Sequence, residues 1–516
     1  MNAIPSQRHL YMGTFEAEAY WRDAQLASLP ALPDRASSAI VAAMDELLFS
    51  FCQPGDALLT RYAISPVHRQ YIAELGFHPA VNERDLTDGM EQAGGNVSAA
   101  SVFELLGSRK ADAREGFPQL EGCVLSPFAG LPHVEEAARA WGITLHQPAL
   151  ETIRKVNAKT YSSDLKRSLG LRNPGHIVTS FADVAEAGRK LLRDGSFLIK
   201  DDFGVSGKGN LHITSTQMLD RIVSYLRGQE RKGKQVLFLL EPFLEKEQDF
   251  SCQFSIGDDG RVDILSVQWL ANTQFAYRES LSPDEAFMER LEREGYFSLM
   301  QDVGRQLYQD GYYGDVCIDS MTLRGGKLEP IIEINARKSM SLIKHQLDNF
   351  LAAKNMRGTL TNYSLSHDGS LSYEELLEGL KCEGLLFTGE REEGIMPLGA
   401  NTLYVNTGGR DGENRIEGHT SISSTTSSNS NATVRGGRSS AKQVRVSGMS
   451  ADHGGSEGNG VAKPGLNGKK EAAGSERTRG KGRLYLELVA AGDEDKMRLT
   501  TKLERFLAEH HFTVLN

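Results

Sequence analysis

A polar, repetitive stretch over residues 408–480 constrains the fold of this chain more than any other feature. Serine, glycine, asparagine and threonine dominate the stretch, and it is almost without aromatic residues. Such a composition cannot bury enough apolar surface to offset the entropy that a chain loses on folding. We therefore expect a disordered low-complexity insertion over 408–480, with the folded part of the protein built from the residues on either side of it.

The segments that flank this insertion carry ordinary signals of secondary structure. Leu398–Asn406 resembles a strand, and Gly482–Val489 (strand), Asp493–His510 (helix) and Phe512–Leu515 (strand) follow the insertion. If the first strand pairs with this tail, 398–407 and 481–516 form one small C-terminal cap. The insertion is then a long loop within that cap, and its removal should be tolerated because loop length changes closure entropy only slowly.

The first 150 residues alternate short apolar runs with helical stretches. Strands are expected at 56–60, 122–126 and 143–146, and helices at 66–75 and from the turn at 127–132 up to Trp141. Alternation of this kind is typical of a parallel sheet with helices on its faces. We therefore predict an N-terminal α/β domain over 1–150.

Residues 151–397 have a different character, with mixed helices and antiparallel strands. The expected elements are a basic helix at 152–169, a strand ending in Phe197-Leu-Ile-Lys200, strands at 236–240, 250–256 and 262–269, a helix near 284–310, a hairpin of strands 314–323 and 328–335, and helices at 342–354 and 373–381. Arg324-Gly-Gly supplies the hairpin turn.

Composition excludes several classes of function. The net charge of −10 gives no electrostatic footprint for nucleic acid, so no such partner is expected. The five cysteines stand singly, without CxxC pairs, which argues against a zinc site or a disulfide framework. The N-terminus lacks a basic start followed by an apolar region, and no run of about 18 apolar residues occurs. These features predict a cytoplasmic protein with no membrane partner.

A lysine and a glycine-rich loop follow an apolar strand in the middle of the chain. Lys200 ends the strand, and Gly204, Ser206, Gly207, Lys208 and Gly209 come directly after it. Glycines let backbone N–H groups approach a phosphate closely, and lysines add positive charge at the same place. The pattern is neither a P-loop nor a dinucleotide fingerprint, so it indicates either a phosphate site or only a flexible turn.

An acidic residue ends the next apolar strand. Glu241 is followed by Phe243 and Leu244, and Asp249 comes eight residues after Glu241. Such a connector could offer backbone groups and a carboxylate to an adenine edge, and Asp249 could accept a ribose hydroxyl. The alternative is that both acids merely end or cap strands.

The hairpin at 314–335 carries the most informative pattern. Asp319 lies on its first strand, and Glu333, Asn335 and Arg337 follow at alternate positions on the second. Residues two apart in a strand share one face, so we expect these three side chains on one side, with Ile332, Ile334 and Ala336 on the other. Carboxylate and amide oxygens suit Mg²⁺, and Asp319 could aim at the same ion. A solvated strand face is the alternative.

In this order the motifs resemble those of the ATP-grasp superfamily, in particular amino-acid and peptide ligases of natural-product pathways. The resemblance covers roughly 110–407. It implies a pre-ATP-grasp domain at 1–150, the two-lobed ATP-grasp domains at 151–397 and a small C-terminal cap. It also implies these roles: Lys159 and Lys200 as nucleotide-contacting lysines, Gly204–Gly209 with Lys208 as the lid, Glu241, Phe243 and Leu244 as the adenine hinge, Asp249 as the ribose acid in place of the commoner Glu, and Glu333-Ile-Asn335-Ala-Arg337 with Asp319 as the metal and phosphate site.

The resemblance implies an ADP-forming carboxylate–amine ligase that uses ATP and Mg²⁺, for which Mn²⁺ can substitute. A substrate carboxylate is activated as an acyl phosphate, with Arg337 and Lys200 as catalytic residues, and an amine of an amino acid or peptide then displaces phosphate. Arg337 could hold the γ-phosphate or the substrate carboxylate, because its planar fork suits both. The alternatives are transfer to a carrier-protein thiol, a small-molecule kinase and a catalytically inactive ATP-binding scaffold.

Overall fold

The computed structural model describes residues 7–515, apart from residues 33, 89–99, 110–113, 206–207, 274–275 and 408–478, and gives no side-chain positions for 205, 208, 273 and 276. Nearly all of the insertion predicted at 408–480 therefore lies outside the described residues. Within the described part of the chain, no helix combines the length and the apolar character needed to cross a membrane.

The N-terminal residues form a small parallel sheet, as the alternation of strands and helices predicts. Its strands are β1 (His9–Met12), β2 (Ala57–Leu58), β3 (Ala80–Val81) and β4 (Val124–Pro127), in the order β3-β2-β1-β4. The helical elements around it are α1 (Ala17–Trp21), α2 (Arg35–Ala42), the 3₁₀ helix η1 (Met44–Phe51), α3 (Pro66–Leu75), α4 (Val102–Ser108) and α5 (Val134–Trp141). The strand expected at 143–146 is reduced to a single bridge between Thr144 and Val124.

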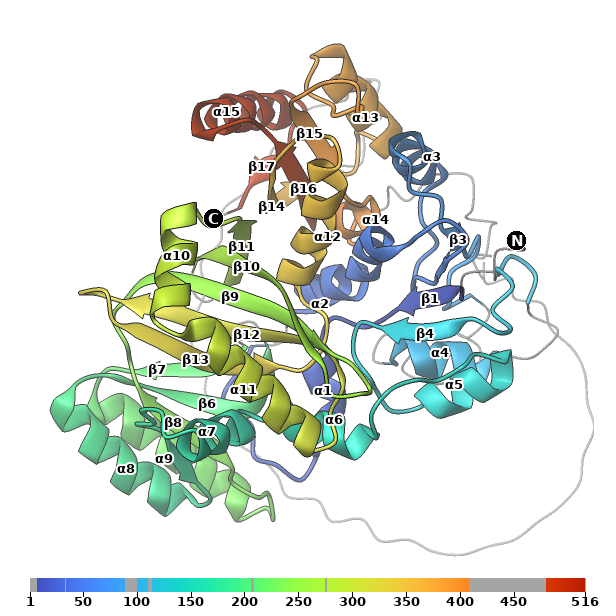
Figure 1. The fold of residues 1–516 in the computed structure, drawn as a ribbon. Coiled ribbons are helices and arrows are strands. Elements are labelled where there is room, and N and C mark those ends of the chain that lie inside the picture. The colour runs from blue at the N-terminus through green and yellow to red at the C-terminus, as the bar shows by residue number, and fades with distance from the viewer. Residues whose placement is uncertain are drawn as a thin grey trace, which may run out of the picture. The chain divides into compact units, whose positions relative to one another are not determined.

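A second sheet is antiparallel and carries the predicted lysine strand. Its order is β5-β8-β6-β7, with β5 (His176–Val178), β6 (Phe197–Val205), β7 (Lys208–Ile213) and β8 (Phe238–Pro242). Helices α8 (Phe181–Asp194) and α9 (Thr216–Glu230) pack on one face, where Phe197 and Ile199 join their hydrophobic core (Figure 1). Because strand residues alternate, Lys200 is directed to the opposite face.

The third sheet has nine strands and is antiparallel throughout. Its order is β13-β12-β9-β10-β11-β14-β16-β15, and β17 also pairs with β14. The strands are β9 (Lys246–Ile256), β10 (Val262–Thr273), β11 (Ala276–Leu281), β12 (Gly314–Leu323), β13 (Leu328–Asn335), β14 (Gly358–His367), β15 (Gly394–Pro397), β16 (Gly480–Val489) and β17 (Thr513–Val514). The helices of this part are α10 (Glu285–Arg293), α11 (Tyr296–Gln309), α12 (Met340–Ala352), α13 (Tyr373–Cys382), α14 (Asn401–Tyr404) and α15 (Asp493–Glu509).

The C-terminal tail continues this large sheet and does not form a sheet of its own. Strand β16 pairs along its whole length with β14, and β14 in turn pairs with β11. The strand–helix–strand order predicted for the tail is present as β16, α15 and β17. The proposed cap at 398–407 and 481–516 therefore shares its sheet with the strands of the central region.

Other predicted elements also differ from the structure, and the strand expected to end at Lys200 continues to Val205 as β6. The helix expected at 152–169 is two helices, α6 (Leu150–Val156) and α7 (Lys159–Ser168), and the helix at 284–310 divides at Gly295, which has φ +74°. The prediction of a strand at Leu398–Asn406 is wrong. The strand lies earlier, at β15, and α14 follows because the carboxylate of Glu46 accepts the N–H groups of Ala400 and Thr402 at 3.2 Å. A carboxylate placed at free N–H groups favours the start of a helix.

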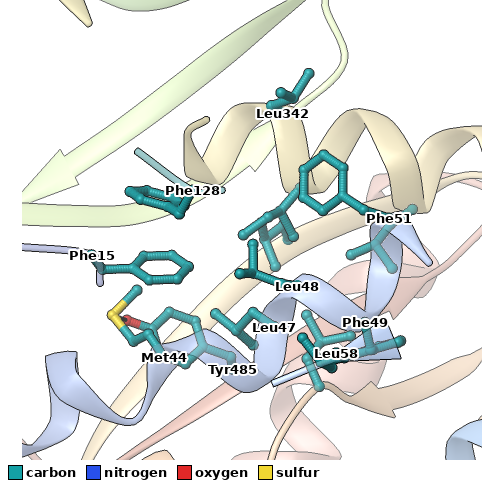
Figure 2. Close-up of a cluster of buried hydrophobic side chains, with 14 of the residues drawn as sticks. Phe15, Met44, Leu47, Leu48, Phe49, Phe51, Leu58, Phe128, Leu342 and Tyr485 are labelled. Carbon is teal, nitrogen blue, oxygen red and sulfur yellow. Dashed lines mark hydrogen bonds between the residues drawn. The ribbon is translucent and has the colours of Figure 1, made fainter. Parts of the chain in front are cut away.

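One hydrophobic core connects the N-terminal residues to the nine-stranded sheet. Figure 2 shows η1 side chains such as Leu47 and Leu48 near Tyr485 of β16 and Leu342 of α12. Phe15 stacks on Phe128 with ring centroids 4.0 Å apart. This contact fixes the loop after β4, which also borders the predicted metal and phosphate motif.

We expect that residues 410–478 can be replaced by a short Gly/Ser linker with little loss of stability or turnover. The residues on either side are already tied together, because the Asn406 side chain donates a hydrogen bond to the carbonyl of Lys481 at 2.8 Å. Shortening a loop between fixed ends changes closure entropy slowly. Thermal melting and phosphate release of the shortened protein test this, and a collapse of either would give the segment a structural or binding role.

A buried carboxylate on β16 should make stability depend on pH. Burial raises the pKa of Glu487 to about 8, despite the nearby ammonium of Lys344 on α12, 3.6 Å away. The folded chain then holds a proton that the unfolded chain has released, so stability falls as pH rises from about 4.5 to about 8. Glu487→Gln should flatten this fall, so its melting temperature relative to wild type should rise with pH. A difference that is constant between pH 5 and 9 would contradict the assignment.

Candidate active site

Four of the predicted site residues form one charged cluster, although four different elements supply them. Lys159 begins α7, Lys200 lies on β6, and Asp319 and Glu333 lie on β12 and β13. The Lys159 ammonium is 3.0 Å from Glu333 Oε1, and the charges of Glu333 and Asp319 both act on Lys200. The predicted lysine strand and the predicted metal face therefore meet.

Lys159 connects the acidic face to the glycine-rich loop. Its Nζ donates a hydrogen bond to the carbonyl of Gly204 at 2.7 Å while it pairs with Glu333, and its side chain is 3% exposed. A buried ammonium of this kind must be paired, and here both partners belong to predicted nucleotide-binding motifs. One cation thus links the start of the loop to the carboxylate of β13.

Lys200 is held by the acid that ends the neighbouring strand. Its Nζ lies 2.5 Å from Glu241 Oε2, and both side chains are buried. Burial alone would lower the pKa of Lys200, but Glu241, then Glu333 and Asp319, outweigh it, so the pKa is raised. Burial would likewise raise the pKa of Glu241, and Lys200, Lys166 and Lys159 lower it instead. Both groups are therefore charged at neutral pH.

The predicted metal residues lie together at the hairpin. Asp319 and Glu333 are directly opposite in the register of β12 and β13, which places their side chains on the same face. Asn335 Nδ2 donates to Asp319 Oδ2 at 3.0 Å. Burial, and next the charge of Glu333, raise the pKa of Asp319 to about 7. Two facing carboxylates with an amide beside them offer oxygen ligands for a divalent cation.

This donor set fits Mg²⁺, which accepts few protein ligands and takes further oxygens from phosphate and water. Within the described ranges, no three Asp, Glu, His or Cys side chains converge as a metal centre. Asp319, Glu333 and Asn335 would supply two carboxylates and one amide oxygen, so the rest of a coordination shell would come from a nucleotide and water.

Arg337 leaves the strand face on which it was expected. β13 ends at Asn335. The Arg337 N–H then donates to the Asn335 carbonyl at 2.9 Å, which closes a three-residue turn centred on Ala336 and changes the direction of the chain. The guanidinium nevertheless stays beside the cluster, because Nη2 donates to Asn335 Oδ1 at 3.2 Å. It also donates to Glu18 Oε1 through Nε at 2.9 Å and Nη2 at 2.5 Å, and it lies 5.5 Å from the centre of the Phe128 ring.

The predicted adenine hinge and ribose acid lie at the ends of β8 and β9. Phe243 stacks on His212 with centroids 4.2 Å apart and remains 38% exposed, and Leu244 follows it half-buried. Asp249 forms an ion pair with Lys246 and accepts a hydrogen bond from Asn272 at 2.9 Å. Its charge contributes to the raised pKa of Asp319, which places it near the acidic face.

The lid prediction is only partly covered by the described residues. Ser206 and Gly207 lie outside them, and the side chain of Lys208 is not described. Gly209 has φ +113°, and a Cβ there would approach the Cα of Gly204 to 2.8 Å. Only glycine fits such a backbone without strain, so the close approach of β6 and β7 explains this glycine.

Sequence reasoning missed three residues around the site. Glu18 lies more than three hundred residues from its partner Arg337, and no local pattern signals the contact. Lys166 of α7 forms a buried ion pair with Glu329 of β13 at 3.1 Å. Asn157 contacts the backbone of the turn after β13. The spacing of Lys159 and Lys166, two turns apart on one helical face, is the one signal that could have identified Lys166.

Comparison with known proteins gives one curated relative. The chain is 25% identical over 226 residues to the [butirosin acyl-carrier protein]–L-glutamate ligase of Niallia circulans, across 43% of this chain and 52% of the relative. The chain therefore spans about half the length of the curated relative it matches. No family model matches the chain.

Solved structures with a similar arrangement include nucleotide complexes. An N5-carboxyaminoimidazole synthetase of Staphylococcus aureus is 13% identical, with 78% of this chain and 91% of that chain covered and a TM-score of 0.43. A biotin carboxylase domain of Hydrogenobacter thermophilus, in complex with MgADP, is 20% identical, with 47% and 58% covered and a TM-score of 0.37. The name of the curated relative is that of a ligase, the class of enzyme that the motifs of this chain predict.

Proposed function

We propose that this chain is an ADP-forming ligase that uses ATP and Mg²⁺ to activate a carboxylate as an acyl phosphate and joins it to an amine, of an amino acid or a peptide. The observation that carries the proposal is the charged cluster. In it the ammonium of Lys159 pairs with Glu333, and the negative charges of Glu333 and Asp319 act on Lys200. Phosphoryl transfer depends mainly on positioning and charge, and this cluster supplies both.

The side chains suit the two bond-forming steps. A carboxylate oxygen of the substrate attacks the γ-phosphorus of ATP, the bond to ADP breaks, and Lys159 and Lys200 offset the phosphate charge. Arg337 lies beside the acidic face, where its fork can hold the γ-phosphate or the substrate carboxylate. The amine nitrogen then attacks the acyl carbon, phosphate leaves with the bridging oxygen, and the nitrogen loses a proton.

Asp319, Glu333 and Asn335 would hold the metal ion, which supplies positive charge that screens the phosphates of ATP. The side chain of Asn335 is engaged on both sides, since its Nδ2 donates to Asp319 and its Oδ1 accepts from Arg337. Asn335 Oδ1 would be the amide ligand, since an amide oxygen has a second lone pair beside the one that Arg337 uses. Mn²⁺ in place of Mg²⁺ stays a prediction.

A carrier-protein thiol is the second candidate acceptor. The name of the curated relative describes a ligase that joins L-glutamate to an acyl-carrier protein. Transfer to a carrier-protein thiol would use the same activated carboxylate and would differ only in the atom that attacks it, sulfur instead of nitrogen. The carrier reaction is therefore an alternative second half of the proposed mechanism.

A phosphate-release screen tests the proposal. The protein is incubated with ATP, Mg²⁺ and separate pools of amino acids, peptides and phosphopantetheinylated carrier proteins, and ADP and phosphate are measured. We expect release that requires a carboxylate substrate and rises when an acceptor is added. A stable phosphorylated product would identify a kinase, and nucleotide binding without any release would identify an inactive scaffold.

A further inference from the structure

Strand β13 forms the edge of the nine-stranded sheet, and its last residues carry the predicted metal and phosphate groups. The pairing of β13 with β12 ends at Asn335, opposite Cys317. Ala336 follows as the centre of the three-residue turn and is buried. Its N–H and C=O therefore have no strand partner, although buried backbone groups need one.

The side chain of Asn157 supplies both missing partners. Its Oδ1 accepts the N–H of Ala336 at 2.9 Å, and its Nδ2 donates to the carbonyl of Ala336 at 3.3 Å. The same Nδ2 donates to the carbonyl of Ile153 at 2.8 Å, which anchors the carboxamide to α6. Asn157 is 5% exposed. Its carboxamide thus takes the place of one peptide group of an adjacent strand.

The turn at Ala336 lies between the side chains of Asn335 and Arg337, which contact each other through Arg337 Nη2 and Asn335 Oδ1 at 3.2 Å but have further partners on different elements. Asn335 donates to Asp319, and Arg337 donates to Glu18 of α1. Because the two hydrogen bonds from Asn157 fix the peptide groups on both sides of Ala336, they also fix the angle between these side chains. Neither Asp319 nor Glu18 is among the hydrogen-bond partners given above for Asn157.

We propose that Asn157 is a positioning residue for catalysis, which holds Asn335 and Arg337 in their reactive geometry through the backbone of Ala336. This inference rests on the proposed function. A small misplacement of groups around a reacting centre can cost about a hundredfold in rate, so a loosened turn should reduce turnover more than it reduces folding.

Ser162 offers a matched control on the same edge. Its Oγ accepts the N–H of Ile334 at 3.2 Å, and Ser162 is buried to a similar extent. Ile334, unlike Ala336, is still paired with Ile318 of β12, so the ladder holds its backbone when the serine is lost. Ser162→Ala therefore removes an edge hydrogen bond without releasing the turn.

The experiment compares Asn157→Ala and Ser162→Ala in the full-length protein by thermal melting, phosphate release and hydrogen exchange over 335–338. We expect both to melt lower than wild type. Asn157→Ala should lower kcat at least about tenfold and speed exchange at Ala336, whereas Ser162→Ala should change kcat less than about threefold. Equal losses of kcat in the two variants, or unchanged exchange in Asn157→Ala, would overturn the proposal.

Asn157→Asp keeps the experiment decisive if Asn157→Ala does not fold. It retains volume and the acceptor for the Ala336 N–H, but it sets an oxygen against the carbonyls of Ala336 and Ile153, so kcat should again fall and wild-type kcat would overturn the proposal. Wild-type phosphate release is measured first. Its absence with every pool would overturn the proposed function, while exchange at Ala336 would still decide whether Asn157 holds the turn.

Discussion

Glu333→Gln should lower phosphate release by at least about a hundredfold, the scale on which removing one charge-stabilising group acts in other enzymes. The amide retains the shape of the side chain but loses the negative charge that faces Asp319 and pairs with Lys159. Lys159 keeps its hydrogen bond to the carbonyl of Gly204, and Glu333 is partly exposed, so the fold should survive. Phosphate release and thermal melting are measured on the same preparation.

Glu329→Gln is the control on the same strand. Glu329 lies four residues earlier on β13, beyond a shift in the register with β12, and pairs with Lys166, and both side chains are at least 95% buried. Its loss leaves Lys166 buried without its partner, which costs about 3–5 kcal/mol of stability. We expect Glu329→Gln to lower the melting temperature and to keep most turnover below that temperature. Normal turnover in Glu333→Gln would remove Glu333 from the site.

Arg337→Ala should also lower turnover about a hundredfold or more, because a planar cation beside transferring phosphate is lost. It should destabilise the fold as well. Glu18 is buried, and Arg337 donates two hydrogen bonds to its Oε1. Truncation leaves this carboxylate without its counter-ion, which is the costly way to break a buried pair.

The double variant Arg337→Ala with Glu18→Gln separates these two effects. Removing the charge of Glu18 should restore most of the lost melting temperature, because a neutral amide is cheaper to bury than an unpaired carboxylate. Turnover should remain as low as in Arg337→Ala. If the double variant regains turnover together with stability, Arg337 has a structural role only.

The sequence predicts the parts of the site that depend on local spacing. Asp319 and Glu333 could be placed on one face because a hairpin pairs them and strand residues alternate, and the register confirms this. The face on which Lys200 lies could be predicted for the same reason, although β6 does not end there and continues to Val205. In each case the relevant geometry spans only a few residues.

The contacts that the sequence does not predict depend on distant segments. The helix expected at 152–169 is interrupted at Asn157, whose side chain binds the backbone of Ala336 instead of facing solvent. Arg337 leaves the strand face because β13 and its pairing with β12 both end at Asn335, and Glu18 then holds the guanidinium. The helix α14 replaces an expected strand because Glu46 of η1 caps it. Local propensity carries no information about such partners.

Isotope transfer tests the central claim, activation of a carboxylate as an acyl phosphate, most directly. Once a substrate pair has been identified, the carboxylate substrate is labelled with ¹⁸O and the products are analysed by mass spectrometry. The carboxylate oxygen that attacks phosphorus leaves with phosphate when the acceptor attacks the acyl carbon, so we predict one ¹⁸O in the inorganic phosphate and none in ADP. Product formation with unlabelled phosphate, or label in AMP, would contradict the account.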